Sequence, residues 1–250
     1  MLKGRSLAFI LPLYNARHVL HDTFAHLKSF VQNSNVEVKL IFVDDGSSDG
    51  SFTLLQEFVR EMPGNVVVLQ NDHNRGKGYS IQKGLSACQG IDYVGFTDID
   101  LPYTLDPVML ALTMMQEHGK DAVIGDRSLL EVKQYSLYRK ACTSVFRILV
   151  PTLLKEFPDT QSGIKFFTAD AARHAFSKLL THKWVFDIEL LLALREGGYT
   201  IGRIPVKLSS VDSTWGGVSF VRHGWGIVKD LLVIHRGMRK GHYTSRHRNK

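Results

Sequence analysis

The sequence lacks a cysteine framework, a long apolar run and a linker rich in proline or serine. Its 250 residues include only two cysteines, Cys88 and Cys142, without C-x-x-C spacing. Neither a disulfide scaffold nor a zinc site is therefore expected, and a reducing cytoplasm fits. No stretch approaches the roughly 20 uninterrupted apolar residues that a membrane-spanning helix requires. The apolar segment 7–12 is too short and lacks a signal peptide's cleavage region, so we expect neither an integral membrane protein nor a secreted one.

Without a linker, repeat or low-complexity tract, the chain gives no sign of separate domains. At 44% hydrophobic content it is long enough for one large α/β domain with a full core, although its length would also permit two. We expect residues 1–210 to form the main domain. We expect residues 211–250 to extend it with an amphipathic helix and a basic tail. The sequence gives no indication of the oligomeric state.

Acidic residues are absent from the last fifteen positions, where most of the excess positive charge lies. The formal net charge is +7, and these positions supply +6 of it. The basic residues there are Arg236, Arg239, Lys240, Arg246, Arg248 and Lys250. A nucleic-acid surface needs aromatic or groove-reading side chains among its charges, and only Tyr243 accompanies these, so no nucleic-acid partner is expected. Two interpretations stay open: a disordered, solvated tail, or attraction to an anionic surface.

What is present is a regular alternation of apolar runs and helix-period segments. The predicted strands lie at residues 7–12, 40–43, 66–69, 93–97, 122–125, 164–167 and 201–208. The helical patterns lie at residues 19–31, 52–59, 107–118, 133–154 and 185–195, with a further helix after residue 78. This alternation predicts an α/β fold with a mostly parallel sheet covered by helices.

Asp98 and Asp100 directly follow the apolar run 93–96. If the strand continues through them, both side chains point the same way and converge. Two neighbouring carboxylates favour a hard divalent cation, although aspartates at strand ends are also common turn formers. Polar clusters at 44–49 and 74–78 lie at other predicted strand ends, with the first also offering helix caps. Ligands of parallel sheets bind at this edge, so these clusters together predict a binding site.

Six motifs in a fixed order extend this prediction. They are LPLYN at 11–15, VDDGS at 43–47, NRGKG at 74–78, DID at 98–100, GDR at 125–127 and DTQSG at 159–163. The chain resembles the family 2 nucleotide-sugar glycosyltransferases of the GT-A (Rossmann-like) fold over roughly residues 5–235. Within that family it is most similar to the dolichyl- or polyprenyl-phosphate hexose synthases. Segments 186–191 and 204–206 also resemble the glucosyl branch.

The resemblance implies a nucleotide site at the ends of the first strands. Asp44 and Asp45 would accept hydrogen bonds from the nucleobase, because a carboxylate suits the N–H groups of uracil or guanine. The other residues that would contact the nucleotide are Pro12, Tyr14, Asn15, Gly76, Lys77 and Asp98. Simpler interpretations stay open: turn-forming aspartates, Asn15 as a helix cap, and a common glycine–lysine turn before a helix.

The resemblance also implies that Asp98 and Asp100 hold Mg²⁺ or Mn²⁺ against the donor diphosphate, with Asp100 as the more direct ligand. Such an ion neutralises the charge that develops on the leaving group. One position departs from the family pattern. The mannosyl branch usually reads D-A-D-L-Q, whereas this chain has Pro102 where that branch has a metal-supporting Gln. The difference disfavours the mannosyl branch.

On the acceptor side, the resemblance assigns Arg127, Arg139 and Ser162 to a phosphate group. Arginine grips phosphate bidentately, although Arg139 would also suit a solvated helix face. Asp159 would lie by the reaction centre, where it would act as a base or position the acceptor. Because an ionised phosphate needs little deprotonation, positioning is the favoured role. Together with Asp100, Arg127 and Asp159 are the candidate catalytic residues.

Two further groups have competing interpretations. Asp187 and Glu189 are interpreted as carboxylates at a helix start, where they favour the helix dipole, rather than as site residues. A helix around Phe220, Trp225 and Leu231 is either packed on the core or lies in a membrane interface with its aromatic side chains in lipid.

The implied reaction is inverting, metal-dependent transfer of a hexose from a nucleotide-sugar to a polyprenyl or dolichyl phosphate. UDP-glucose is the favoured donor and GDP-mannose the second. We expect a cytoplasmic enzyme held peripherally on the inner face of a membrane. Two alternatives stay open: the same donor chemistry on a non-lipid acceptor, and a non-catalytic nucleotide-sugar binding protein.

Overall fold

The computed structural model describes residues 2–130, 157, 159–160, 162–183, 185–207 and 220–244. Its strands are β1 (Ser6–Leu13), β2 (Glu37–Asp44), β3 (Val66–Gln70), β4 (Tyr93–Phe96), β5 (Ala122–Asp126), β6 (Lys165–Thr168) and β7 (Ile201–Pro205). Its helices are α1 (Arg17–Asn33), α2 (Ser51–Glu61), α3 (Lys77–Leu85), α4 (Asp106–Glu117), α7 (Ala169–Ser177), α8 (Phe186–Glu196) and α9 (Phe220–Arg239), with a 3₁₀ turn η1 (Arg127–Leu129). The predicted helix over 133–154, which carries Arg139, lies outside the described residues, as does the tail beyond residue 244.

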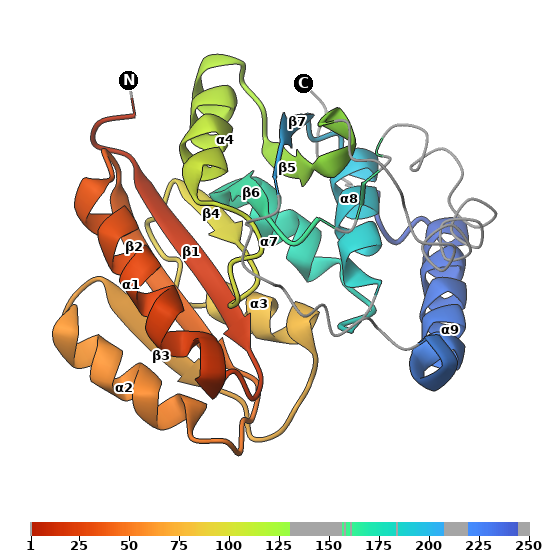
Figure 1. Ribbon diagram of the computed structural model, residues 1–250. Coiled ribbons are helices and arrows are strands. Elements are labelled where there is room, and N and C mark those ends of the chain that lie inside the picture. The colour runs from red at the N-terminus through yellow and green to blue at the C-terminus, as the bar shows by residue number, and fades with distance from the viewer. Residues whose placement is uncertain are drawn as a thin grey trace.

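The described strands form one sheet in the order β3-β2-β1-β4-β6-β5-β7 (Figure 1). The pairs β1–β2, β2–β3, β1–β4 and β5–β7 are parallel. β6 alone among these strands is reversed, since it runs antiparallel to both of its neighbours, β4 and β5. The predicted mostly parallel sheet is therefore confirmed, with one inserted antiparallel strand that the alternation of patterns did not predict.

Strand β1 lies at the centre of the protein because it is apolar on both faces. All eight of its residues are buried. Leu7, Phe9 and Leu11 join one core cluster, and Ala8 and Ile10 join the other, as the two-residue period of a strand requires. Burying each large apolar side chain stabilises the fold by about 1.5–3 kcal/mol.

The helices divide between these two faces. Buried side chains of α1, α2 and α4 belong to the cluster of Leu7 and Phe9, and those of α3, α7, α8 and α9 belong to the cluster of Ala8 and Ile10. The result is a three-layer arrangement in which both faces of the sheet are covered. The α/β class and the GT-A type of layering expected from the sequence are both present.

Helix α9 packs on the core with one face only. Ile227, Leu231 and Ile234 are buried in the cluster that also contains α8, whereas Trp225 is 83% exposed. Figure 1 shows α9 at the right of the molecule, beside the α7–α8 region. Tyr243 is only 1% exposed, so of the two interpretations of the last fifteen residues, a disordered and solvated tail does not describe residues 236–244. Among the described residues, no helix is both long and apolar enough to cross a membrane.

Candidate active site

The predicted polar clusters meet at one edge of the sheet. Because β1, β2, β4 and β5 run in the same direction, their carboxyl ends all open there. Strand β6 runs the opposite way, so its amino end brings residues 162–164 to the same edge. Segments that are distant in the sequence thereby surround one region, as the rule for ligand sites in parallel sheets predicts.

The loops after β1 and β2 are tied together by direct hydrogen bonds. The Asn15 backbone N–H donates to Ser47 Oγ at 2.8 Å, and the Ser48 N–H donates to Asn15 Oδ1 at 2.9 Å. Asn15 has a left-handed backbone with φ of 50°, which Asn tolerates better than most residues. It does not cap α1, as one interpretation of the sequence had it, because its side chain binds the neighbouring loop. Tyr14 beside it is half-exposed, and Pro12 is buried in β1.

Asp44 and Asp45 are both buried, but their carboxylates have different hydrogen-bond partners. The Asp45 carboxylate accepts the backbone N–H groups of Arg75 at 2.9 Å and Gly76 at 2.8 Å, and also the Asn71 side-chain amide. Asp45 therefore fixes the shape of the loop before α3. Each Asp44 oxygen accepts one hydrogen bond among the described residues, from Ser47 N–H and from the Gln70 amide. A carboxylate oxygen has two lone pairs, so Asp44 retains acceptor capacity for a ligand.

The glycines of the NRGKG motif allow the loop to pack closely on residues 182–186. Gly76 has a φ of 99°, and a Cβ there would lie 2.6 Å from the His182 carbonyl oxygen. The Gly78 N–H donates to that same carbonyl at 2.9 Å, and a Cβ at Gly78 would lie 2.9 Å from the Phe186 ring. The requirement for glycine at these two positions therefore comes from packing within the protein.

Asp98 and Asp100 lie in a turn rather than in a strand. Strand β4 ends at Phe96, the Leu101 N–H donates to the Asp98 carbonyl at 3.1 Å, and Leu101 has a φ of 44°. The strand alternation used to predict their convergence is therefore wrong, because the chain turns before that geometry applies. The turn nevertheless brings the two carboxyl groups together. Partial burial, and then the negative charge of Asp98, raises the pKa of Asp100.

Lys77 lies against this carboxylate pair. Its Nζ is 2.6 Å from Asp98 Oδ1, with both side chains partly exposed. Burial opposes the charged form of Lys77, but the Asp98 and Asp187 carboxylates outweigh it and raise the pKa. Lys77 therefore holds a positive charge near the carboxylates of Asp98 and Asp187, at the edge where the carboxyl ends of the parallel strands lie.

The carboxylate pair suits a divalent ion in its donor chemistry. Oxygen ligands from aspartates are those that Mg²⁺ and Mn²⁺ prefer, and the mutual repulsion felt by Asp100 is what a cation would relieve. Within the described part of the chain, no third His, Cys, Asp or Glu side chain completes a larger cluster with them. Gly163 leaves the room that Asp98 occupies, since a Cβ there would overlap Asp98 Oδ2.

Arg127 and Asp159 form a buried, bidentate ion pair. Arg127 Nε lies 2.6 Å from Asp159 Oδ2, and its Nη2 lies 2.5 Å from Oδ1. The Arg127 backbone N–H also donates to Asp159 Oδ2, and each residue is no more than 5% exposed. The structure thus brings together two predicted catalytic residues, with Ser162 fully buried nearby in the chain. It directs the Arg127 guanidinium toward Asp159, and Arg139 lies outside the described residues.

Several side chains at this edge were not predicted as site residues. The Lys165 ammonium is fully buried and donates to the Ser162 carbonyl and to Asp187 Oδ1, both at 2.6 Å. Burial lowers the pKa of Lys165, and the Asp187 charge opposes that shift. A lysine within the apolar run 164–167 was the available signal, because an isolated charge inside a strand needs a buried partner.

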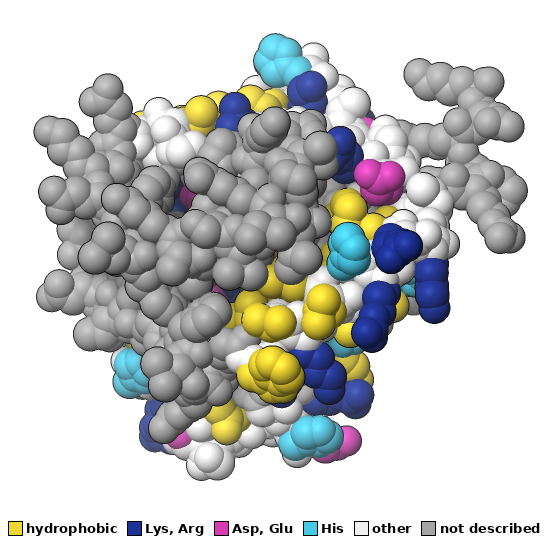
Figure 2. Space-filling view, turned by 90° about the vertical axis from the view of Figure 1, so that its right-hand side faces the viewer, with side chains coloured by type: hydrophobic (Ala, Val, Ile, Leu, Met, Phe, Trp, Pro, Cys, Tyr) yellow, Lys and Arg dark blue, Asp and Glu magenta, His cyan; other side chains and the backbone are white. Residues whose placement is uncertain are grey.

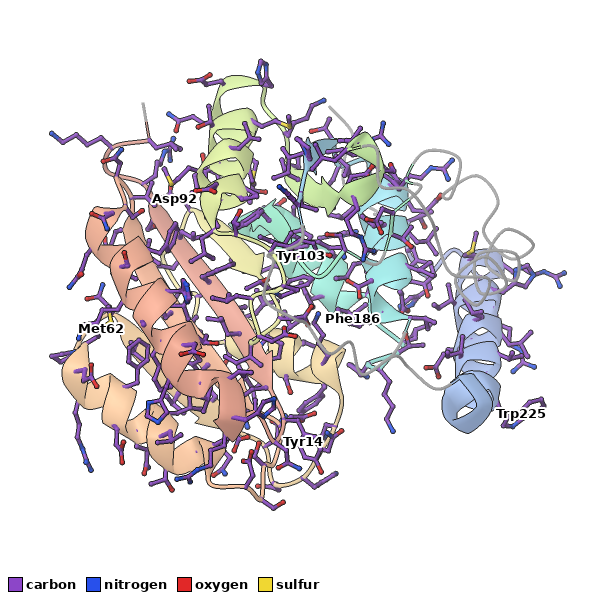
Figure 3. All side chains as sticks on the ribbon, viewed as in Figure 1. Tyr14, Met62, Asp92, Tyr103, Phe186 and Trp225 are labelled. Carbon is purple, nitrogen blue, oxygen red and sulfur yellow. The ribbon has the colours of Figure 1, made fainter. Side chains whose placement is uncertain are left out.

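Tyr103 is a second unpredicted residue. It is 3% exposed, and Figure 3 shows it at the centre of the molecule, where the strand ends converge. Burial raises the pKa of its phenol, while the positive charge of Arg127 opposes the shift. Tyr103 follows Pro102, the position at which the chain departs from the mannosyl pattern.

The interpretation of Asp187 and Glu189 as helix-start carboxylates is incomplete. Both lie in the first turn of α8, as predicted. Their oxygens, however, accept hydrogen bonds from outside the helix: Asp187 from Lys165, and Glu189 from Thr181 and Tyr243. Both therefore join α8 to neighbouring segments.

Comparison with known proteins gives consistent relatives. The chain is 28% identical over 224 residues to the dolichyl-phosphate beta-glucosyltransferase of Dictyostelium discoideum, covering 83% of this chain and 68% of that protein. It is 28% identical over 251 residues to the dolichyl-phosphate beta-glucosyltransferase of Homo sapiens, covering 92% of this chain and 75% of that protein.

Solved structures share the fold at lower identity. The mannosyl-3-phosphoglycerate synthase of Rubrobacter xylanophilus superimposes with a TM-score of 0.68 at 15% identity, covering 96% of this chain and 76% of that one. The glucosyl-3-phosphoglycerate synthase of Mycobacterium tuberculosis, in complex with Mn²⁺, UDP-glucose and phosphoglyceric acid, gives 0.65 at 18% identity, covering 93% and 80%. These matches confirm the GT-A fold. Residues 8–174 also match the sequence family described as glycosyl transferase family 2. The resemblance seen in the motifs is therefore confirmed, and the chain belongs to glycosyltransferase family 2, a family of enzymes.

Proposed function

We propose that this enzyme transfers glucose from UDP-glucose to the phosphate of a dolichyl or polyprenyl phosphate, with inversion at the anomeric carbon. The observation that carries the proposal is the Asp98–Asp100 turn, with Lys77 against it, at the carboxyl ends of the strands. The named relatives support glucose and a dolichyl phosphate over mannose and other acceptors. Pro102, which stands where the mannosyl branch has Gln, also supports glucose over mannose.

We assign a resident Mg²⁺ or Mn²⁺ to the carboxylates of Asp98 and Asp100. Such an ion, when bound, neutralises charge that develops on the leaving nucleoside diphosphate. The Mn²⁺ and UDP-glucose in a structure of the same fold support this assignment. Gly163 keeps the Asp98 carboxylate in place by leaving room for it.

The described geometry supports the remaining donor contacts that we propose. Asp44, with acceptor capacity on both oxygens, accepts the N–H of the uracil ring. Tyr14 and Asn15 flank the nucleoside on the loop that Ser47 and Ser48 hold in place. Lys77 provides positive charge for the diphosphate, and its raised pKa keeps it protonated. Asp45 acts indirectly, because its carboxylate is engaged by the backbone of the loop around Gly76.

On the acceptor side, an oxygen of the lipid phosphate attacks the anomeric carbon. The bond from that carbon to the diphosphate oxygen breaks, and its electron pair leaves with UDP. A phosphate oxygen that is already ionised needs no base. Asp159 therefore positions Arg127, which it holds by two hydrogen bonds, and Arg127, Arg139 and Ser162 are our candidates for contacts to the acceptor phosphate.

The outer face of α9 supports docking at a membrane surface that holds the lipid acceptor. The residues exposed along this face are Trp225, Lys229, Leu232, Arg236 and Arg239, spaced three or four positions apart. Figure 2 shows hydrophobic side chains beside Lys and Arg side chains on this side of the molecule. Each cation near an anionic leaflet contributes about 1 kcal/mol or less, which suits reversible docking on the inner face. We name these five residues the α9 outer face.

The decisive experiment measures transfer of labelled glucose from UDP-glucose, and of labelled mannose from GDP-mannose, into an organic-extractable polyprenyl phosphate. Both assays contain Mg²⁺ or Mn²⁺. We expect lipid-linked glucose from the native enzyme and about a thousandfold less from Asp100→Ala, which corresponds to roughly 4 kcal/mol of lost stabilisation. Asp106→Ala removes an exposed carboxylate at the start of α4 and is the matched control, with transfer unchanged.

Other outcomes would replace the proposal. Asp100-dependent hydrolysis of UDP-glucose without lipid product would move the acceptor away from the lipid. Nucleotide binding without turnover of either donor would favour a non-catalytic binding protein.

A further inference from the structure

Glu189 is a fully buried carboxylate that the reaction does not use. It accepts four hydrogen bonds: from the Leu180 N–H at 2.7 Å, the Thr181 N–H at 2.9 Å, the Thr181 hydroxyl at 2.7 Å and the Tyr243 hydroxyl at 2.7 Å. A buried carboxylate is tolerated only when hydrogen bonds replace its lost hydration. Because the four donors come from residues 180–181 and from Tyr243, Glu189 fixes the positions of two separate segments.

One of these segments is residues 180–183, which lies directly against the loop of Gly76–Gly78. We call this loop the donor loop. The carbonyl of His182 accepts the Gly78 N–H at 2.9 Å and leaves no space for a Cβ at Gly76. The ring of His182 also contacts Tyr79 edge-on, with 5.8 Å between ring centroids. Any shift of residue 182 would therefore move the first turn of α3, the helix that begins at Lys77.

The other segment is the turn after α9. Tyr243 is buried, and its neighbour His242 exchanges hydrogen bonds with Lys178: the Lys178 ammonium donates to the His242 carbonyl at 2.9 Å, and His242 Nε2 lies 3.0 Å from the Lys178 carbonyl. Gly237 allows this approach, since a Cβ there would lie 3.0 Å from the Tyr243 hydroxyl. Residues 242 and 243 are thus hydrogen-bonded to Lys178 and Glu189, on either side of residues 180–183.

We infer that Glu189 and Tyr243 are positioning residues of the donor site, which hold the Gly76–Gly78 loop through residues 180–183. The inference rests on the proposed function in one respect, namely that this loop binds the nucleotide-sugar. The Tyr243 hydroxyl fixes one Glu189 oxygen, Glu189 fixes Thr181, and His182 fixes Gly78. The C-terminal segment is accordingly part of the support of the site, more than 160 residues from the loop in sequence.

The test compares Tyr243→Phe with Tyr199→Phe. Both variants lose one phenol that donates to a carboxylate, since Tyr199 donates to Asp170 at 2.8 Å, away from the donor loop. We expect Tyr243→Phe to raise the KM for UDP-glucose about three- to tenfold with kcat changed less than twofold, because a loosened loop weakens donor and transition state alike. Tyr199→Phe leaves both constants unchanged. Glu189→Gln gives a larger rise in KM, with Glu196→Gln, an exposed carboxylate at the end of α8, as its control.

Hydrogen exchange of the Gly78 and Thr181 amides gives a readout that does not depend on turnover. We expect both amides to exchange about tenfold faster in Tyr243→Phe and at the native rate in Tyr199→Phe. Unchanged KM together with unchanged exchange would overturn the inference, as would a loss of kcat at constant KM. If the native enzyme does not use UDP-glucose, the proposed function fails, and the exchange rates alone still support or overturn the positioning role.

Discussion

At the scale of single residues, the addition of one methyl group at Gly163 is expected to disturb the candidate metal site. A Cβ there would overlap Asp98 Oδ2, so Gly163→Ala displaces that carboxylate from Asp100 and Lys77. We expect the variant to fold and to lose about a hundredfold in transfer rate, which equals roughly 2.7 kcal/mol.

Steady-state transfer and thermal unfolding measured together check this expectation. Gly226→Ala is the control, since nothing lies within 4 Å of a Cβ there and both activity and melting temperature should be maintained. Native activity in Gly163→Ala would mean that the Asp98 position is not needed.

The sequence was sufficient to place some residues of the candidate site and insufficient for others, for identifiable reasons. Asp98, Asp100 and Lys77 were predicted because short motifs place them at strand ends. Lys165 and Glu189 were not, since their roles depend on partners that come from distant segments: Ser162 and Asp187 for the lysine, and Thr181 and Tyr243 for the glutamate. A buried charge is recognisable in a sequence, but its partner is set by the fold.

At the scale of elements, the turn after β4 shows how the two aspartates come near each other although the predicted local geometry is wrong. The apolar run predicted a strand through residue 97, and β4 ends one residue earlier. The turn between Asp98 and Leu101 leaves the two carboxyl groups near enough for the charge of Asp98 to help raise the pKa of Asp100. Leu101 in a left-handed conformation gives no sequence signal, because glycine or asparagine is the usual residue there.

Helix α7 was missed although its signals were present. Thr168 caps the helix by accepting the Ala171 N–H, and the buried positions 171, 172, 175 and 176 repeat with a helical period. The helix follows β6 without a break, so the apolar strand pattern runs directly into it. Short elements with no intervening turn are the hardest to separate by periodicity.

The α9 outer face carries a prediction at the same scale. Changing Lys229 and Arg236 together to Glu replaces attraction to an anionic leaflet by repulsion. We expect at least about a tenfold weaker partition onto vesicles that contain anionic lipid, since each cation contributes up to roughly 1 kcal/mol. Cosedimentation with vesicles at two salt concentrations measures the effect.

The matched control changes Lys3 and Arg60 to Glu, two exposed cations outside α9. It alters the net charge equally, and its partition should stay close to that of the native enzyme. Equal losses in both variants would show that net charge, rather than the α9 outer face, governs docking. Donor hydrolysis should be unaffected in both, because neither pair contacts the site.

At the scale of the whole molecule, the alternation of patterns predicted the α/β class and most strands within a few residues. It did not predict the place or direction of β6. The order of strands is decided by which apolar faces pack together. The segment between β5 and β6 is so long that local sequence patterns do not indicate where β6 joins the sheet. A mostly parallel sheet was the expectation, and all the described strands except β6 run in the same direction.

The stability of the whole chain should depend on pH through Cys88. Burial raises the pKa of its thiol to about 11 from an ordinary value near 9. Between these values the unfolded chain releases the thiol proton while the folded chain retains it. The unfolded state thus binds fewer protons, and the folded state loses stability as the pH rises.

Urea unfolding at pH 8 and pH 10 measures this contribution. The native protein should lose about 1.4 kcal/mol more over this interval than Cys88→Ala, in which the thiol is absent. Identical losses would indicate that the thiol ionises equally in both states.

The place of β6 in the sheet also determines the order in which the protein can assemble. Among the described strands, β5 and β7 join the other four only through β6, which is made some forty residues after β5. A growing chain therefore has its first four strands ready to pair early, while β5 must wait beside them for its neighbour. Contacts between such distant segments form slowly, because a long loop must close first. Strands β1 to β4, with Asp44 at the end of β2, can therefore pair during synthesis, whereas Arg127 and Asp159 come together only when β6 closes the sheet.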